Sequence, residues 1–284
     1  MYPPERIVCL TEETTETLYL LGEQDRIVGI SGYTVRPPQA RREKPRVSAF
    51  ISADMPKILA LQPDLVLTFS DLQAELVASL VRAGVSVHAF NQRTVAEILD
   101  MIRLLGALVG TPDRAKTLAD ELAANVEATR RRTGRAAPRP KVYFEEWDEP
   151  MISGIAWVSE LVQAAGGDDI FPELAACKSA RDRVVTPDEV IRRAPDIVIG
   201  SWCGKKFKSE KFIARPGFES LPAVRNRRPH RRTRRAGGDH QRQATVTENS
   251  RPAAPARPAA RSTPSSTLPD MTAVKRWLMW VCCP

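Results

Sequence analysis

TPDRAKTLADELAANVEATRRRT, residues 111–133, predicts one long helix that divides the chain. It opens with Thr-Pro-Asp, which supplies an N-cap, a residue suited to the first helical position and a carboxylate for the positive end of the helix dipole. Apolar side chains recur at helical spacing at Leu118, Leu122 and Val126. Three arginines and then Gly134 favour its end. At about 1.5 Å per residue the helix would span roughly 35 Å, the width of a small domain.

The sequence on the two sides of this helix follows a similar pattern. Short apolar runs alternate with helical stretches in both halves, as is typical of a parallel sheet covered by helices. The clearest correspondence joins ILALQPDLVLTFS, residues 58–70, to VIRRAPDIVIGSW, residues 190–202. Each reads as the end of a helix, a Pro-Asp turn, a short buried strand and a polar loop. The sequence therefore predicts an α/β fold with two parallel-sheet lobes, one long connecting helix and a ligand cleft between the lobes.

The domain boundaries follow from this repeat. We expect an N-terminal lobe in residues 1–110, the connecting helix in 111–134, and a C-terminal lobe in 135–226 that lacks a final strand and helix. Residues 227–284 form an Arg-, Pro- and Ala-rich tail whose composition does not favour a packed core. We favour a shifted reading frame near Asn226 as the origin of this irregular tail. A basic arm for nucleic acid or anionic lipid is the alternative.

The net charge of +8 belongs to this tail. From residue 225 onward there are 13 Lys and Arg against 3 Asp and Glu, which leaves 29 basic and 31 acidic residues before it. The lobes are nearly neutral, so we expect no nucleic-acid partner. No apolar run reaches the roughly 18 to 20 residues of a membrane span. The N-terminus as written has no signal peptide, which favours a cytoplasmic location.

Motifs for catalysis and metal binding are not found in the sequence. It contains no P-loop, GxGxxG or GxSxG pattern, and its five cysteines lack zinc-type spacing. Two of the three histidines lie in the tail. We therefore expect neither an enzyme, nor a metal site, nor a required cofactor. A cytoplasmic enzyme or metallocluster-assembly protein on the same two-lobe scaffold is the alternative from another class.

Several segments resemble the helical-backbone class of ABC-transporter substrate-binding proteins, and its cobalamin-binding branch most of all. The resemblance covers about residues 5–226 and rests on RIVCLTEETTETLYLLGEQDRIVGIS at 6–31, PPQA at 37–40, ILALQPDLVLTFSD at 58–71 and RPGFESLPAVRN at 215–226. It implies a protein that binds cobalamin, a ferric siderophore or haem and passes it to an ABC permease. For secreted members it also implies a periplasmic location.

Ligands of parallel α/β proteins lie where loops leave the carboxyl ends of the strands. The candidate ligand-binding residues at such positions are Glu12, Glu13, Tyr33, Phe69 and Ser70 in the first lobe, and Glu146, Trp147, Arg181 and Trp202 in the second. Phe69 and Trp202 hold nearly matching positions in the repeat and could enclose a flat macrocycle. The resemblance supports Phe69, because an aromatic residue follows the same strand in cobalamin-binding members. Packing of Phe69 beneath its own loop is the alternative.

Three further groups leave more than one interpretation open. Glu145, Glu146 and Asp148 offer oxygen ligands for Mg or Ca, but successive strand residues face opposite sides and need not converge. Arg181 and Arg183, in Arg181-Asp182-Arg183, could supply paired cations for an anionic ligand group or belong to a solvated loop with local ion pairs. The resemblance places Glu75 where the family has an acidic residue that docks on permease arginines, and without it Glu75 is a solvated helix residue.

These observations predict a monomeric, bilobal binding protein. It would capture a cobalamin-like corrinoid between its lobes for an ABC importer, without covalent chemistry and without itself spanning the membrane. The first alternative keeps the fold and exchanges the ligand for a ferric siderophore or haem.

Overall fold

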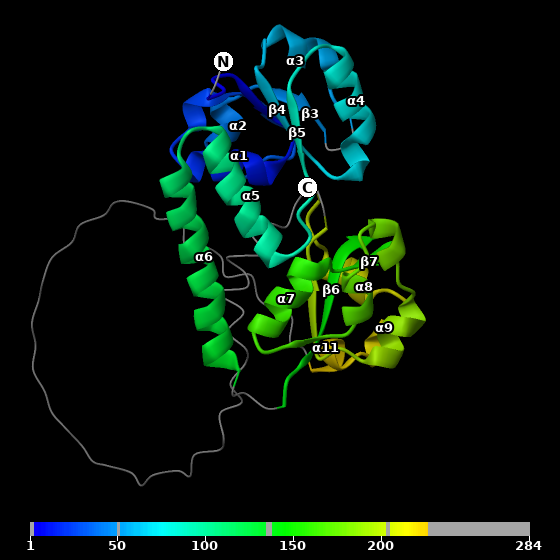
Figure 1. Cartoon of the computed structure of the whole chain (residues 1–284). Coiled ribbons are helices and arrows are strands. Elements are labelled where there is room, and N and C mark those ends of the chain that lie inside the picture. The colour runs from blue at the N-terminus through cyan, green and yellow to red at the C-terminus, as the bar shows by residue number, and fades with distance from the viewer. Residues whose placement is uncertain (1–2, 50–51, 135–137, 203–204, 227–284) are drawn as a thin grey trace, which may run out of the picture. The chain divides into compact units, whose positions relative to one another are not determined.

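The predicted connecting helix is present as α6 (Pro112–Thr133), which begins directly after Thr111 and ends at Gly134. The structure is a computed structural model that describes residues 3–49, 52–134, 138–202 and 205–226 (Figure 1). The predicted irregular tail therefore lies outside the described residues. No helix in the described part of the chain combines the length and apolarity needed to cross a membrane.

The first lobe contains the predicted parallel sheet. Its five strands pair in the order β3-β2-β1-β4-β5, and every pairing is parallel. The strands are β1 (Ile7–Cys9), β2 (Ile27–Ser31), β3 (Arg46–Ser48), β4 (Leu65–Phe69) and β5 (Val87–Phe90). All five carboxyl ends consequently meet at one edge of the sheet, which is where the sequence placed the site.

Alternating side chains give this sheet two apolar faces. Ile7 and Cys9 of β1 belong to one buried cluster, whereas Val8 belongs to another, as the two-residue period of a strand requires. Helices α1 (Glu12–Leu20) and α5 (Val95–Leu108) cover the first face. The second face is covered by α3 (Met55–Ala60) and α4 (Ala74–Arg82), as Figure 1 shows. The chain between β2 and β3 includes the short helix α2 (Ala40–Glu43), and η1 (Gln24–Arg26) and η2 (Asp71–Gln73) are single 3₁₀ turns.

The second lobe has a mixed sheet, which differs from the purely parallel sheet that we expected. Strand β6 (Lys141–Asp148) pairs in parallel with β8 (Asp168–Asp169) and β9 (Ile197–Gly200), but antiparallel with β7 (Met151–Ser153). This strand was expected to end before Glu146 and Trp147, which we placed in the loop that leaves it. It continues to Asp148 because the chain reverses at once and β7 supplies hydrogen-bonding partners for this second half.

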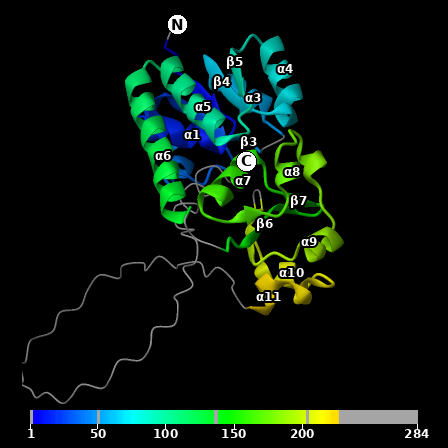
Figure 2. The same cartoon turned by 60° about the horizontal axis from the view of Figure 1, so that its bottom comes forward.

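Short helices complete the second lobe, and α9, α10 and α11 share one apolar cluster with Tyr143 of β6. Figure 2 shows these three helices at the end of the lobe that is turned forward. The elements are α7 (Ala156–Ala164), α8 (Pro172–Ala175), η3 (Ala180–Arg183), α9 (Pro187–Arg193), α10 (Ser209–Ile213), η4 (Phe218–Ser220) and α11 (Pro222–Arg225).

The helices α5, α6 and α7 connect the lobes. One buried cluster contains apolar residues from β1 and α5 of the first lobe, from α6, and from β6 and α7 of the second. Two hydrogen bonds add to it: the Trp157 amide donates to the Arg93 carbonyl oxygen at 2.9 Å, and the Val95 amide donates to Glu160 Oε2 at 2.8 Å. Glu160 of α7 thereby accepts from an otherwise free amide at the start of α5.

The close approach of α5 to α6 depends on Gly106. A Cβ atom on this glycine would lie 2.1 Å from the Ala115 Cβ and 3.1 Å from the Thr111 carbonyl oxygen. The first of these distances is far inside van der Waals contact, so a side chain at residue 106 would force the two helices apart. Any such shift would also disturb the cluster that joins the lobes.

We predict that Gly106→Ala destabilises the protein although alanine is the better helix former. The change gains up to about 1 kcal/mol of helix propensity but overpacks a buried contact, which typically costs about 1 to 3 kcal/mol. The free energy of unfolding from urea titrations should therefore fall. Leu104→Ala, on the exposed side of the same helix, is the control with a small effect. A stabilised Gly106→Ala variant would contradict the packing of α5 on α6.

Candidate functional site

Buried carboxyl groups lie at the carboxyl end of β1, where α1 begins. Glu12 is buried, and burial first, then the charge of Glu13, raises its pKa to about 8. Burial also raises the pKa of Glu13, against hydrogen bonds with Thr11 and Gln92 that lower it. The Oε1 atoms of Glu12 and Glu13 are buried without a hydrogen-bond partner. Near neutral pH Glu12 therefore retains its proton and can donate a hydrogen bond, which an ordinary carboxylate cannot.

The third carboxyl group of α1, that of Glu16, forms an ion pair. Arg36 donates from Nε to both carboxylate oxygens of Glu16, each at 3.1 Å. Burial nevertheless raises the pKa of Glu16. Tyr33, which follows β2, is partly exposed, and its amide donates to Ser31 Oγ at 3.2 Å. The predicted first-lobe residues after β1 and β2 thus lie at the same sheet edge.

Phe69 and Ser70 end β4 at that edge. Phe69 is half-buried against the core, and the guanidinium of Arg93 lies over its ring, 5.2 Å from the centroid. Ser70 has φ 63° and ψ 173°, a combination that is costly for any residue with a Cβ atom. Its amide donates to the Phe90 carbonyl oxygen at 2.9 Å, and its Oγ accepts from the Leu72 amide at 3.3 Å. Such strain is concentrated at binding sites, which supports this turn as part of one.

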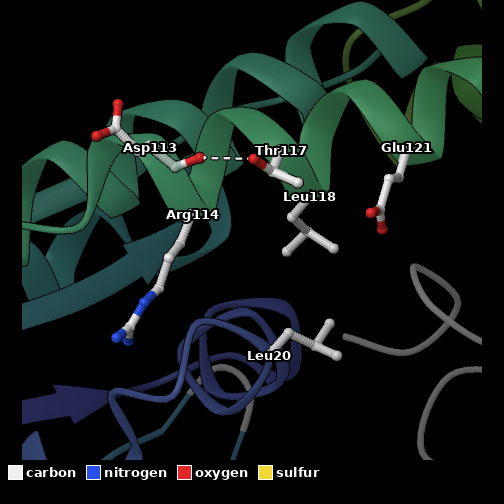
Figure 3. Close-up of a pocket in the computed structure, with 6 residues that line it drawn as sticks. All are labelled: Leu20, Asp113, Arg114, Thr117, Leu118 and Glu121. Carbon is white, nitrogen blue, oxygen red and sulfur yellow. Dashed lines mark hydrogen bonds between the residues drawn. The ribbon is translucent and has the colours of Figure 1, made fainter.

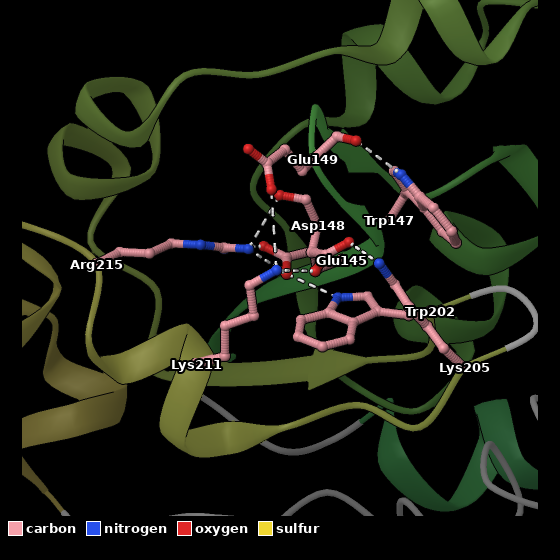
Figure 4. Close-up of polar contacts among 8 residues, drawn as sticks. All are labelled: Glu145, Trp147, Asp148, Glu149, Trp202, Lys205, Lys211 and Arg215. Atoms are coloured by element: carbon pink, nitrogen blue, oxygen red, sulfur yellow. Dashed lines mark hydrogen bonds and ion pairs between the residues drawn. The ribbon is translucent and has the colours of Figure 1, made fainter.

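In the second lobe, Glu145 is the centre of a buried polar network. Its carboxylate is fully buried and accepts from both terminal nitrogens of Arg215, at 2.5 and 3.1 Å (Figure 4). The indole nitrogen of Trp202 donates to Glu145 Oε1 at 2.9 Å, and the Tyr143 hydroxyl lies 3.2 Å from Oε2. Burial and the Glu145 charge raise the pKa of Tyr143, so its hydroxyl stays protonated. The network joins β6, the end of β9 and the segment after α10.

Asp148, at the end of β6, is a second buried carboxylate with its own cations. It accepts from Lys205 and, at 2.7 Å, from Lys211 (Figure 4). Burial alone would raise its pKa, but the hydrogen bonds and charges of the two lysines outweigh burial and lower it. The Lys205 ammonium also lies 3.9 Å from the ring centroid of Trp147, whose own indole nitrogen donates to the Glu149 carbonyl oxygen at 2.9 Å.

Glu146, the remaining acidic residue of β6, pairs with Arg183. This arginine is 2% exposed and donates to both oxygens of Glu146, at 2.7 and 3.1 Å, and to the Ser153 carbonyl oxygen at 2.5 Å. Burial lowers the pKa of Arg93 in the first lobe. The charge of Arg183 also lowers this pKa, whereas the charge of Glu146 raises it. The two arginines therefore lie near the same carboxylate.

Several predicted residues lie in unexpected surroundings. Glu146 and Trp147 are in a strand and not in an exit loop. Trp202 is 2% exposed and packs on Phe207 with 4.9 Å between ring centroids, so its ring presents no open face to a ligand. Arg181 is exposed, and the inward-facing arginine of that turn is Arg183. Glu75 is exposed in the first turn of α4, as a docking residue requires. Arg93 and Arg215 are not among the residues predicted from the sequence, because the carboxylates with which they pair, Asp71 and Glu145, lie 22 and 70 positions away in the chain.

Metal binding by the acidic residues of β6 finds no support in this geometry. Glu145, Glu146 and Asp148 each pair with cations from different elements. Among the described residues, no three His, Cys, Asp or Glu side chains converge as metal ligands. The acidic run is therefore a set of separate ion pairs.

An open hollow lies beside α6, away from this edge. It measures about 390 Å³ and is lined by residues of α1 and α6, which Figure 3 shows: Leu20, Asp113, Arg114, Thr117, Leu118 and Glu121. Leu20 is the last residue of α1, about 12 Å along the helix from Glu12 at about 1.5 Å per residue. The hollow consequently opens at the opposite end of α1 from the strand exits.

Comparisons with known proteins agree with this architecture. A profile of the periplasmic binding protein family matches residues 7–229. The vitamin B12-binding protein of Vibrio cholerae is 29% identical over 234 residues, which cover 79% of each chain. The crystal structure of periplasmic vitamin B12-binding protein BtuF of Vibrio cholerae superposes with a TM-score of 0.62 at 25% identity, covering 79% of this chain and 86% of that one. The periplasmic haem-binding protein RhuT from Roseiflexus sp. RS-1 gives 0.67 at 26% identity, covering 79% and 87%.

We predict that Arg215→Met strongly destabilises the second lobe, because it leaves the buried Glu145 carboxylate without its cation. Removing one partner of a buried pair costs about 3 to 5 kcal/mol. The double variant Glu145→Gln/Arg215→Met removes both charges and should regain a large part of the unfolding free energy measured in urea. Equal stabilities of the single variant and the wild type would show that Glu145 does not depend on Arg215.

A second prediction concerns pH. Folding raises the pKa of Glu12 from 4.5 to about 8, so the folded protein holds this proton more tightly than the unfolded chain. The associated stability is complete below pH 4.5 and is lost as the pH rises through about 8. Between pH 5.5 and 8.5, Tm from scanning calorimetry should fall less steeply for Glu12→Gln than for the wild type. Glu75→Gln, an exposed change, is the control that keeps the wild-type slope. Identical slopes for all three proteins would contradict the burial of a protonated Glu12.

Proposed function

The chain belongs to the periplasmic binding protein family, and from this premise we propose that it captures a cobalamin-like corrinoid between its two lobes for an ABC importer. The relatives and structural neighbours named above are binding proteins. The coarse function is thus that of a substrate-binding protein for B12, haem or an iron-siderophore. The choice of a corrinoid within that range is the part that we argue from the site.

The charge balance of the candidate site carries this choice. Six cations at the candidate site each have a carboxylate partner. Four of them are fully or partly buried: Arg36 with Glu16, Arg93 with Asp71, Arg183 with Glu146, and Arg215 with Glu145. The other two, Lys205 and Lys211, are exposed and pair with the buried Asp148. A polyanionic ferric siderophore, or haem with its two carboxylates, would have to compete with these partners. A ligand of low net charge would leave every pair intact.

The buried carboxyl groups of α1 favour an amide-bearing ligand. Glu12 is protonated near neutral pH and has a buried oxygen without a partner, and Glu13 has such an oxygen too. Protonated carboxyl groups donate to carbonyl oxygens, whereas they offer little to an anion-binding site that needs cations. The amide side chains around a corrin ring are ligand groups of the kind that these residues can bind.

Two aromatic residues suit the flat part of a macrocycle. Phe69 ends β4 in the first lobe and Trp147 lies near the end of β6 in the second, and both rings are only partly buried. We assign ligand contact to these two rings, with Tyr33, Ser70 and Glu146 beside them. Trp202 holds the Glu145 carboxylate in place from inside the lobe, and Arg181 lies at the exposed edge of the site. Stacking on aromatic rings requires no charge on the ligand.

Delivery of the ligand would use the outer surface of the lobes. Glu75 is an exposed carboxylate in the first turn of α4, and we propose that it pairs with an arginine of the membrane permease. Because α5, α6 and α7 share one buried cluster, ligand entry would require only small movements of the lobes about this connection. Binding and release then need no covalent step.

Titration of the full chain with cyanocobalamin, followed by calorimetry, tests this proposal. We predict saturable binding to the wild type and a loss of about tenfold or more in affinity for Phe69→Ala, since an aromatic contact contributes about 1 kcal/mol beyond its buried area. Val81→Ala, an exposed apolar residue of α4, is the control and should bind normally. Haemin and a ferric siderophore, titrated in parallel, should bind more weakly. Tighter binding of either would overturn the corrinoid assignment and leave the substrate-binding role in place.

A further inference from the structure

A cation covers each of the two aromatic rings that we assign to the ligand. The guanidinium of Arg93 lies 5.2 Å from the centroid of Phe69, and the ammonium of Lys205 lies 3.9 Å from the centroid of Trp147. The two contacts come from different lobes and from unrelated segments of the chain. In each lobe the ring therefore interacts with a cation of its own lobe.

Arg93 is held over Phe69 from several directions. Its terminal nitrogen donates to Asn91 Oδ1 at 2.8 Å and lies 3.6 Å from Asp71 Oδ1. Its carbonyl oxygen accepts from the Trp157 amide of α7, which fixes the backbone of the turn. The Nε atom has no hydrogen-bond partner although it is buried. The side chain is thus well placed but incompletely satisfied in this position.

Lys205 is held over Trp147 by a carboxylate at the end of the same strand. Asp148 accepts from Lys205 and also from Lys211, so it keeps one cation if the other moves (Figure 4). Lys205 additionally lies 5.3 Å from the centroid of Trp202. Its side chain is 40% exposed, which leaves room for it to swing away from the indole.

A ring face that carries a cation cannot stack on a flat ligand at the same time. Each cation has a carboxylate neighbour, Asp71 or Asp148, that can keep it neutralised after it leaves the ring. Displacement then costs the attraction between cation and ring, which is small for a partly exposed pair. The exchange is therefore reversible and leaves the buried ion pairs of the lobe intact.

We propose that Arg93 and Lys205 are displaceable covers of the ligand-binding rings, which compete with the flat face of the ligand for Phe69 and Trp147. This inference rests on the proposed function, because it takes the two rings as ligand contacts. The covers would keep the aromatic faces from binding small apolar molecules, and they would select ligands with a face large enough to replace the cation. They are specificity-determining residues that act by competition.

Arg93→Ala and Lys205→Ala test the proposal, with cyanocobalamin and haemin as the two flat probes. Removing a cover should tighten binding of the flat probe about 2- to 10-fold, the ratio that a weak cation–π contact supplies. Arg93→Lys and Lys205→Arg keep a cation over the ring and should restore the wild-type affinity. The matched controls are Arg103→Ala, on the outer side of α5, and Lys206→Ala, the exposed neighbour of Lys205. Calorimetric unfolding identifies any variant that has lost its fold, and Arg93→Ala leaves the buried Asp148 undisturbed.

The outcomes separate this proposal from the proposed function. Tighter binding of cyanocobalamin by both alanine variants supports both, and tighter binding of haemin alone supports the covers while rejecting the corrinoid. Unchanged affinity of both alanine variants for both probes overturns the covers and leaves the corrinoid in place if the wild type binds cyanocobalamin. Weaker binding also overturns them, because it would mean that the cations contact the ligand directly. Failure of every protein, wild type included, to bind either probe rejects both proposals.

Discussion

The fully buried carboxylate of Glu145 is the charge on which the second lobe depends. It accepts hydrogen bonds from Arg215 and Trp202, which follow Glu145 in the chain by 70 and 57 positions. A buried charge without a partner is strongly destabilising, so the three segments must come together for the lobe to fold. The same constraint turns the Trp202 ring inward. A residue that resembles a ligand contact in the sequence thereby acts as part of the scaffold.

The consequence for binding is a site with little uncompensated charge. Glu146 pairs with Arg183 and Asp148 with two lysines, so the acidic strand β6 presents ion pairs and not free carboxylates. On the other lobe, burial keeps Glu12 protonated, which removes a negative charge without the need for a cation. We infer that the rings of Phe69 and Trp147 and neutral hydrogen-bonding groups are what this site offers a ligand. Such a surface suits a large, flat and weakly charged molecule.

The sequence predicted the fold further than it predicted the site. Helix α6, the parallel first sheet and the repeated Pro-Asp turn before β4 and β9 all follow from local patterns with a period of two or 3.6 residues. The acidic end of β6 was misjudged as a loop because its cations lie 37 to 70 residues away, and no local pattern records them. For the same reason the sequence does not distinguish Arg181 from Arg183, of which only Arg183 is buried. The sequence near a residue predicts its position in a strand or turn. It does not predict which distant residue neutralises a buried charge.

A crystal structure of the full chain with cyanocobalamin would show whether a corrin binds between the lobes. We predict electron density for the corrin between Phe69 and Trp147, with the Glu145–Arg215 and Glu146–Arg183 pairs unchanged. Density in the hollow beside Leu20, or a corrin that breaks these ion pairs, would contradict this prediction.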